Sequence, residues 1–196
     1  MIREVIYEAM QSNNNVLSTE QFLNLGISKT TLTNYVREGI LVRCSHGFYT
    51  LPDAIEDDMF LISLRSKHII FSHETALFLN GLSERTPFMH TITIPSNAAI
   101  PATLKDQCKC YYVKPELHGI GVTEKKTTFG NFVRCYDSER TICDILRSRS
   151  RMDEETVIAA IKLYGDSKEK NLHNLGKYAE VFKVGQKVRQ YMEVLL

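Results

Sequence analysis

Residues 28–37 gather side chains whose chemistry suits contact with a nucleic acid. Hydroxyl and amide groups bond the edges of bases, and Lys and Arg neutralise phosphates. Leu32, Tyr35 and Val36 lie at i, i+3 and i+4, the spacing of one buried helix face. The polar positions that remain are Ser28, Lys29, Thr30, Thr31, Thr33, Asn34 and Arg37. The segment therefore predicts a helix with a polar outer face, which is also a common composition for a face that is only solvated.

Start and stop signals place a second helix directly before this one. Ser18, followed three residues later by Gln21, matches a capping box, and Gly26 can end that helix in the left-handed conformation. Ser28 can then cap the next helix, and Gly39 stops it. Two short capped helices joined by a tight glycine-containing turn predict a helix-turn-helix.

A further helix and a hairpin flank this pair. Apolar residues at helical spacing over 2–10 predict a helix, which the asparagines at 13–15 end. Residues 40–43 and 47–51 read as two strands around the turn at 45–47, where Ser, His and Gly tolerate unusual backbone angles. The hairpin is the wing of a predicted winged helix-turn-helix.

Pro52 marks the predicted end of this first domain, because proline disfavours continued strand pairing. We expect a winged helix-turn-helix over residues 1–52 and a second domain over 57–196. Arg43 and His46 on the wing join the polar helix face as the candidate DNA-binding surface. A winged helix can instead serve as a protein–protein module, so an interaction adaptor that does not bind DNA sequence-specifically stays open as the alternative.

The charge of the chain is distributed unevenly. The formal net charge is +1, and residues 1–52 hold four basic and four acidic side chains. Residues 105–151 hold ten basic against six acidic, and 162–189 hold seven against three. A module without net charge offers few phosphate contacts, so we expect the second half to supply more, unless these cations are simply solvated. The accessory candidates are Arg147, Arg149, Arg151, Lys168, Lys170 and Lys177.

The second half predicts a mixed domain. Strand patterns occur at 69–71, 91–95, 110–113 and 132–136, and indicate a small mixed sheet. Helices are expected over about 54–66 and 73–80, after a cap at Asp137 or Ser138, and over about 153–165, 171–183 and 185–195. The fold class expected for the whole chain is α+β, with C-terminal helices following the sheet.

Two polar features of this half have a structural explanation. His73 follows Ser72, a candidate helix cap, and we interpret it as a structural histidine because no partner motif accompanies it. Arg140, Asp144 and Arg147 lie on one flank of the helix after residue 137, as either a binding surface or an ion-pair ladder. The ladder is favoured for Arg140 and Asp144, since both border the apolar face.

Motifs for catalysis or metal binding are weak. Glu124-Lys125-Lys126 matches a nuclease E-x-K fragment with Asp106 upstream, but a charged hairpin turn explains it better. Cys108-x-Cys110 with His118 lacks a fourth ligand at suitable spacing, and five cysteines without a CxxC pair favour reduced thiols. The sequence contains no GxGxxG, Walker A or GxSxG pattern. We expect a protein that is not an enzyme and that uses no cofactor and no metal.

The order of the parts resembles a known family. The N-terminal helix-turn-helix is followed by Phe71-Ser72-His73-Glu74-Thr75-Ala76-Leu77, and later by Ser138-Glu139-Arg140-Thr141-Ile142-Cys143-Asp144-Ile145-Leu146. Together these resemble the AbiEi antitoxins of type IV abortive-infection toxin–antitoxin systems. The resemblance implies a phage-defence protein that represses its own operon by binding operator DNA through its N-terminal domain. It also implies that the C-terminal domain opposes a nucleotidyltransferase-type toxin without forming a stable complex with it.

The expected location is the cytoplasm. Met1-Ile2-Arg3-Glu4 places charges where a signal peptide needs apolar residues, and no run of 18 apolar residues is present. We therefore expect no membrane partner. DNA with repeated half-sites is the expected partner.

Overall fold

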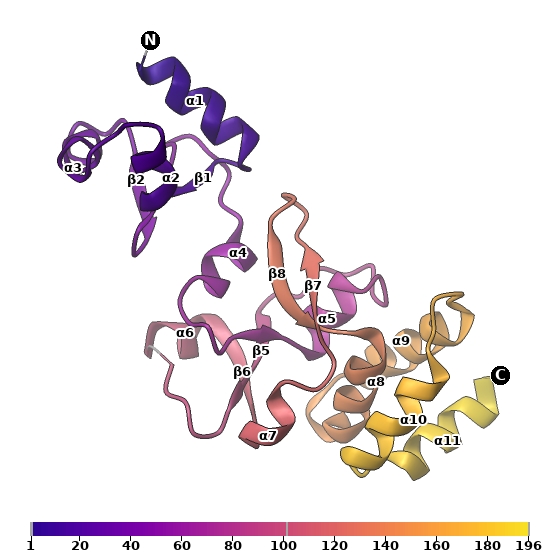
Figure 1. Ribbon diagram of the computed structural model, residues 1–196. Coiled ribbons are helices and arrows are strands. Elements are labelled where there is room, and N and C mark those ends of the chain that lie inside the picture. Colours follow the sequence, from indigo (N-terminus) through magenta and orange to yellow (C-terminus); the bar gives the residue numbers. More distant parts are fainter. Residues whose placement is uncertain (1, 101, 196) are drawn as a thin grey trace. The chain divides into compact units, whose positions relative to one another are not determined.

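The computed structural model describes residues 2–100 and 102–195, and it shows an α+β fold. The side chains of Ile2, Arg3, Thr103, Val194 and Leu195 lie outside the described part. The chain divides into two compact units (Figure 1). The first comprises residues 1–65 with 127–131, and the second comprises 66–126 with 132–196. The predicted fold class, with helices and a mixed sheet, is confirmed.

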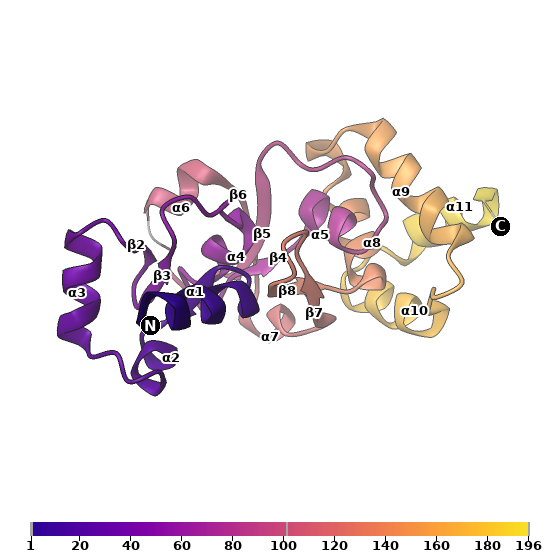
Figure 2. The ribbon, with the colours of Figure 1, turned by 90° about the horizontal axis from the view of Figure 1, so that it is seen from above.

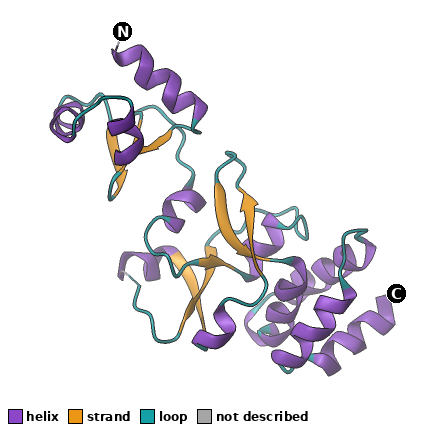
Figure 3. Ribbon diagram, in the orientation of Figure 1, coloured by secondary structure: helices purple, strands orange, loops and turns teal. Residues whose placement is uncertain are grey.

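The first unit begins with three helices and a small antiparallel sheet (Figure 3). Its described strands are ordered β1-β3-β2, so the last strand of the hairpin pairs with both others. The bounds are α1 (Ile2–Ser12), β1 (Val16–Ser18), α2 (Thr19–Asn24), α3 (Lys29–Arg37), β2 (Val42–Ser45), β3 (Phe48–Thr50) and α4 (Asp58–Ser63). The sequence analysis did not predict strand β1. In this stretch it predicted only the helix cap at Ser18.

Local capping explains where these helices begin and end. The Ser18 hydroxyl accepts a hydrogen bond from the Gln21 backbone N–H, and the Gln21 side chain accepts one from the Ser18 backbone, so the predicted capping box is confirmed. Ser28 caps α3 by accepting from the Thr31 backbone N–H at 3.1 Å. Gly26 and Gly39 have φ angles of +79° and +70°, as expected at helix ends. An apolar core of Ile6, Met10, Leu17, Phe22, Ile27, Leu32 and Leu41 holds the elements together.

A buried polar cluster attaches residues 127–131 to the first unit. The Asp57 carboxylate accepts from the Phe60 backbone N–H, the Thr127 hydroxyl and the Asn131 amide. The amide of Asn14 in turn donates to the Asn131 side-chain oxygen at 3.3 Å. The first compact unit therefore continues past Pro52, to Arg65, and takes in a turn far away in the sequence.

The second unit is built on a mixed sheet whose described strands are ordered β6-β5-β4-β8-β7. Strand β4 pairs antiparallel with β5 and parallel with β8. The edge strand β6 pairs parallel with β5, and the edge strand β7 pairs antiparallel with β8. The strands are β4 (Ile70–Phe71), β5 (His90–Pro95), β6 (Cys108–Val113), β7 (Val122–Lys126) and β8 (Phe132–Tyr136). The helices are α5 (His73–Leu79), α6 (Ala102–Gln107), α7 (Pro115–His118), α8 (Ser138–Arg147), the 3-10 helix η1 (Arg149–Arg151), α9 (Glu154–Asp166), α10 (Leu172–Val181) and α11 (Gly185–Leu195).

Helices α8 to α11 gather into one bundle (Figure 2), whose apolar core also includes residues of α5 and β6. Arg140 lies in this bundle with no exposed surface. It bonds Asp144 (Nε to Oδ2, 3.0 Å) and the backbone oxygens of Leu117 and Ile120, and its guanidinium covers the Phe182 ring. Burial raises the pKa of Asp144, and the Arg140 charge opposes that rise. The ion-pair interpretation of Arg140 and Asp144 is confirmed, whereas Arg147 is exposed and contacts the Phe182 ring.

Two local predictions for the second unit are wrong. Ser72 precedes α5 but makes no side-chain capping bond, because its hydroxyl contacts the His73 ring and accepts from Thr93. Glu124-Lys125-Lys126 lies in edge strand β7, and the hairpin turn follows it at 127–131. Charged side chains on an edge strand discourage pairing with another sheet, which accounts for this run. No helix among the described residues is long and apolar enough to cross a bilayer.

Candidate nucleic-acid interface

Helix α3 presents the polar side chains that its sequence predicts. Leu32 is buried at 1% exposure and fixes which side of the helix faces the core. Tyr35 and Val36 pack against the same core. The remaining positions form the outer face: Ser28, Lys29, Thr30, Thr33 and Arg37 are exposed, while Thr31 and Asn34 are half-buried. Figures 1 and 2 both show α3 next to β2.

Hydrogen bonds within α3 order part of this face. The Ser28 and Thr31 hydroxyls lie 2.9 Å apart, and the Thr33 hydroxyl donates to the Lys29 backbone oxygen at 3.0 Å. These bonds restrain the hydroxyl groups near the start of the helix. The Arg37 guanidinium donates to the Asn34 side-chain oxygen at 3.2 Å, so the asparagine amide is held in one orientation. An oriented amide is suited to paired hydrogen bonds with a base edge.

The hairpin that follows α3 carries the other two candidate residues. Arg43 on β2 and His46 in the turn are both exposed, and their side chains meet at 2.9 Å (Nη2 to Nδ1). Arg43 also donates from Nε to the Ser45 backbone oxygen at 3.4 Å. Arg43 and His46 therefore form one polar group at the tip of the hairpin.

A contact that sequence reasoning missed anchors this tip. The backbone N–H and the hydroxyl of Thr19 both donate to the Gly47 backbone oxygen, at 2.7 and 3.2 Å. Gly47 has a φ of +74°, a backbone conformation that residues other than glycine rarely adopt. The first turn of α2 thus fixes the hairpin turn. The sequence places Thr19 directly after the helix cap at Ser18. It gives no indication that Thr19 bonds a residue 28 positions away.

The accessory cations have different surroundings, all within the second unit. Arg149 pairs with Glu154 and lies over the Tyr191 ring, and the Arg151 guanidinium lies 4.5 Å from the Tyr111 ring centroid. Lys170 donates to the Gly165 backbone oxygen at the end of α9. Arg147, Lys168 and Lys177 are exposed. The Arg149–Glu154 pair is solvent-accessible, and such pairs contribute little to stability, so its guanidinium can exchange partners at little cost.

His73, the residue most suggestive of catalysis, is tied into the fold. It is 3% exposed, its Nδ1 and Nε2 lie 3.1 Å from the hydroxyls of Ser72 and Ser148, and its ring stacks on Tyr111. Burial and the nearby cations, led by Lys109, lower the pKa of His73 well below 6.5. The neutral imidazole therefore links α5 to the end of α8.

The described residues contain no group of three or more His, Cys, Asp and Glu side chains that could hold a metal ion. The cysteines of the described part are free thiols, and burial raises the pKa of the Cys108 thiol to about 11. A thiol with a raised pKa is a poor nucleophile and a poor metal ligand.

The match to a family model covers the N-terminal part of the chain, which contains α3. Residues 3–52 match a family described as a transcriptional regulator and AbiEi antitoxin. Residues 3–52 are similar to the AbiEi antitoxin family. This confirms the resemblance drawn from the sequence, and the AbiEi match contains α1, both later helices of the helix-turn-helix and the hairpin.

The fold of the chain resembles a solved structure. The crystal structure of the RV2827C protein from Mycobacterium tuberculosis aligns with a TM-score of 0.66 and 12% sequence identity, covering 96% of this chain and 75% of that one. At this identity the likeness shows a shared fold. No curated protein matches the chain.

Proposed function

We propose that this chain is a DNA-binding autorepressor and antitoxin of a type IV toxin–antitoxin operon. Its first fifty residues act as a winged helix-turn-helix on operator DNA upstream of its own operon. The observation that carries the proposal is that the family match falls on the domain whose helix α3 exposes an ordered polar face. We place α3 in the major groove, with the hairpin as the wing.

The roles proposed for the individual residues follow from their chemistry. Thr31 and Asn34 read base edges, since a hydroxyl and an oriented amide can bond them. Lys29, Arg37 and Arg43 contact phosphates, and Ser28, Thr30, Thr33 and His46 add hydrogen bonds around them. The balanced charge of residues 1–52 limits the phosphate contacts of this domain, so cations of the second unit add more on repeated half-sites.

The second unit carries the antitoxin activity in this proposal. It opposes a nucleotidyltransferase-type toxin in the cytoplasm without a stable complex, as the resemblance to type IV antitoxins implies. The full chain with Asn34→Ala and Arg37→Ala then loses repression and still protects cells from the cognate toxin. Loss of protection by a folded double variant would contradict this division of labour.

A gel-shift titration with the upstream DNA of the operon and a scrambled duplex tests the DNA-binding function. The repressor is expected to bind the upstream DNA more tightly, and its affinity for both duplexes is expected to fall as salt rises. An interaction adaptor gives no salt-sensitive, sequence-selective shift, so the same titration separates the two functions.

A further inference from the structure

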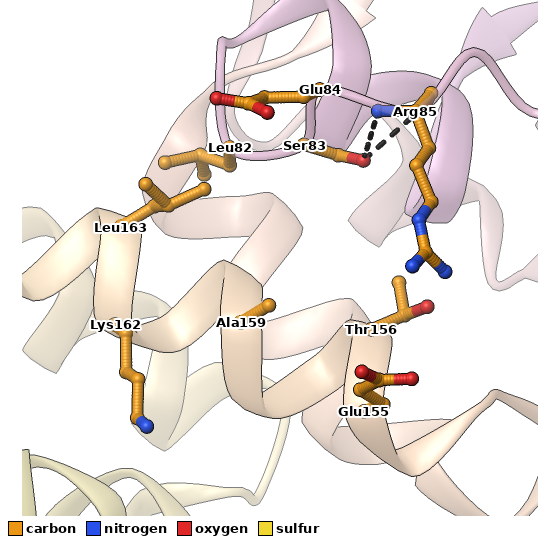
Figure 4. A pocket seen from close by; sticks show the side chains of 9 residues that line it. All are labelled: Leu82, Ser83, Glu84, Arg85, Glu155, Thr156, Ala159, Lys162 and Leu163. Atoms are coloured by element: carbon orange, nitrogen blue, oxygen red, sulfur yellow. Dashed lines mark hydrogen bonds between the residues drawn. The ribbon is translucent and has the colours of Figure 1, made fainter.

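The polar surfaces of the chain differ in the charges that they present. A hollow of about 420 Å³ beside α9 is bordered by groups of both signs, which are Glu84, Glu155, Arg85 and Lys162 (Figure 4). A mixture of this kind selects no one class of ligand. Helix α3 differs, because residues 29–37 contain basic side chains and no acidic one.

The outer face of α3 has a central stripe. Thr30, Asn34 and Arg37 follow one another at i, i+4 and i+7, on the side of the helix opposite to the buried Leu32. Within the part of the chain that the structure describes, Arg37 pairs with no carboxylate, although Glu38 is next to it. A helix in the major groove turns such a stripe toward the base edges.

Arg37 determines which hydrogen-bonding groups Asn34 offers to a base. Its Nη2 donates to Oδ1 of Asn34 at 3.2 Å. A guanidinium has donors and no acceptor, so the atom that it faces is the amide oxygen. The amide nitrogen Nδ2 of Asn34 has no partner among the described residues, so its N–H groups stay available. The two residues therefore present donors to an approaching base.

Guanine is the base whose major-groove edge matches a surface of donors. It offers two neighbouring acceptors, N7 and O6, whereas adenine offers N7 beside an N6 amino donor. The adenine amino group would lie next to the Arg37 guanidinium, donor against donor. An asparagine whose Oδ1 is unbound prefers adenine instead, because it can accept from N6 and donate to N7.

We propose that Arg37 is a positioning residue that changes the base read by Asn34 from adenine to guanine. Its Nη2 occupies Oδ1 of Asn34, and Nδ2 donates to the acceptor pair of a guanine. The other N–H groups of the guanidinium bind the backbone phosphate, which keeps Arg37 beside Asn34 in the complex. This inference rests on the proposed DNA-binding function and adds the class of base that its reading helix selects.

Selection from a pool of duplexes with a randomised central stretch provides the DNA sequence that the full-length parent binds. At the base pair read by Asn34, we expect guanine to bind at least about fivefold more tightly than adenine, the lower end of base discrimination. Inosine at that position should bind as guanine does, because it lacks only the minor-groove amino group. An inosine duplex as weak as the adenine duplex would contradict reading in the major groove.

Arg37→Met tests the positioning role, since it removes the charge and the donors at an exposed position. Affinity should fall for every duplex through the lost phosphate contact, and the ratio of guanine to adenine affinity should fall to one or below. Arg43→Met is the matched control, because Arg43 is an exposed cation that makes no contact with Asn34. It should lower affinity and leave the ratio unchanged.

A double variant separates positioning from direct reading. Asn34→Ala should abolish the guanine preference, and adding Arg37→Met to it should leave the ratio where Asn34→Ala set it. A further fall of the ratio in the double variant would show that Arg37 itself reads guanine, which would overturn the proposal.

The remaining outcomes separate this inference from the function on which it rests. If no duplex is selected from the pool, the proposed DNA binding fails, and this inference fails with it. If a duplex is selected and Arg37→Met leaves its base preference unchanged, DNA binding stands and the positioning role of Arg37 is refuted. A parent that prefers adenine at the base pair read by Asn34 would refute it as well.

Discussion

Arg37 donates a hydrogen bond from Nη2 to the Oδ1 atom of Asn34, 3.2 Å away and one helical turn earlier on α3. The cation and the amide therefore act as one group on the outer face of the helix. Replacing either residue removes the hydrogen bond that orients the other.

Asn34→Ala is expected to reduce binding to the operator by about 1–3 kcal/mol and binding to scrambled DNA by much less, because an amide that reads a base contributes to specific binding. Fluorescence anisotropy with both duplexes at one fixed salt concentration measures the two losses. Asn97→Ala, at an exposed asparagine of the second unit, is the matched control and should bind as the parent does. Equal losses on both duplexes would exclude base reading by Asn34.

Reversing the charges of Arg147, Arg149 and Arg151 to glutamate is expected to flatten the plot of log affinity against log salt concentration. Each lost phosphate contact removes about 0.9 from the slope, so three contacts remove about 2.7. Base preference should not change, since phosphate contacts carry no sequence information.

Arg149 and Arg151 make ring contacts within the second unit, so circular dichroism must show that the triple variant is folded. Lys168→Glu with Lys177→Glu provides a second test at exposed positions. Unchanged slopes in both variants would show that the first domain binds DNA without help from these cations.

Asp57→Asn is expected to destabilise the first unit by about 1–3 kcal/mol. The carboxylate accepts three hydrogen bonds, and an amide at this position turns one acceptor into a donor beside the Thr127 and Asn131 donors. Urea unfolding measures the loss, and Asp53→Asn, at an exposed aspartate, should stay within about 0.5 kcal/mol of the parent. Similar stability of the two variants would mean that the buried cluster contributes little.

Gly121→Ala is expected to cost about 2–4 kcal/mol, because Gly121 has a φ of +75° and an added Cβ would lie 2.6 Å from the Cβ of Arg140. Gly176 in α10 is the matched control, since its added Cβ meets nothing within 4 Å. Gly176→Ala should stabilise the chain by about 0.5–1 kcal/mol through helix propensity. Thermal unfolding measures the midpoint of each variant. A shift of both midpoints in the same direction would refute the steric explanation.

The stability of the chain is expected to fall as pH drops below about 6.5, in part because of His73. Burial and nearby cations lower the pKa of His73, so the unfolded chain binds this proton before the folded one does. The contribution of His73 is therefore complete above its unfolded pKa and is lost as the pH falls toward its folded pKa. Asn tolerates the positive φ of +46° at this position, so His73→Asn removes the titration and keeps the backbone.

Urea unfolding of parent and His73→Asn chains between pH 8 and pH 5 isolates this contribution. Burial raises the pKa of Asp137 and Asp144, which gives the opposite slope, but both proteins share those groups. The difference between the two curves should shrink as pH falls. A constant difference would show that His73 keeps its ordinary pKa in the folded chain.

The sequence alone determined the features that depend on near neighbours. Ser18, Ser28 and Asp137 bond backbone groups three residues later, so the starts of α2, α3 and α8 follow from local spacing. The buried face of α3 follows from helical periodicity for the same reason, and with it the polar face proposed to bind DNA. Strand β8 was also predictable, since its alternating pattern is local.

The tertiary structure decided the contacts between residues far apart in the chain. Asp57 meets Thr127 and Asn131, and the Arg140 side chain reaches the backbone of Leu117 and Ile120. No spacing rule links such residues, because their meeting depends on the order of the strands and the packing of the helices.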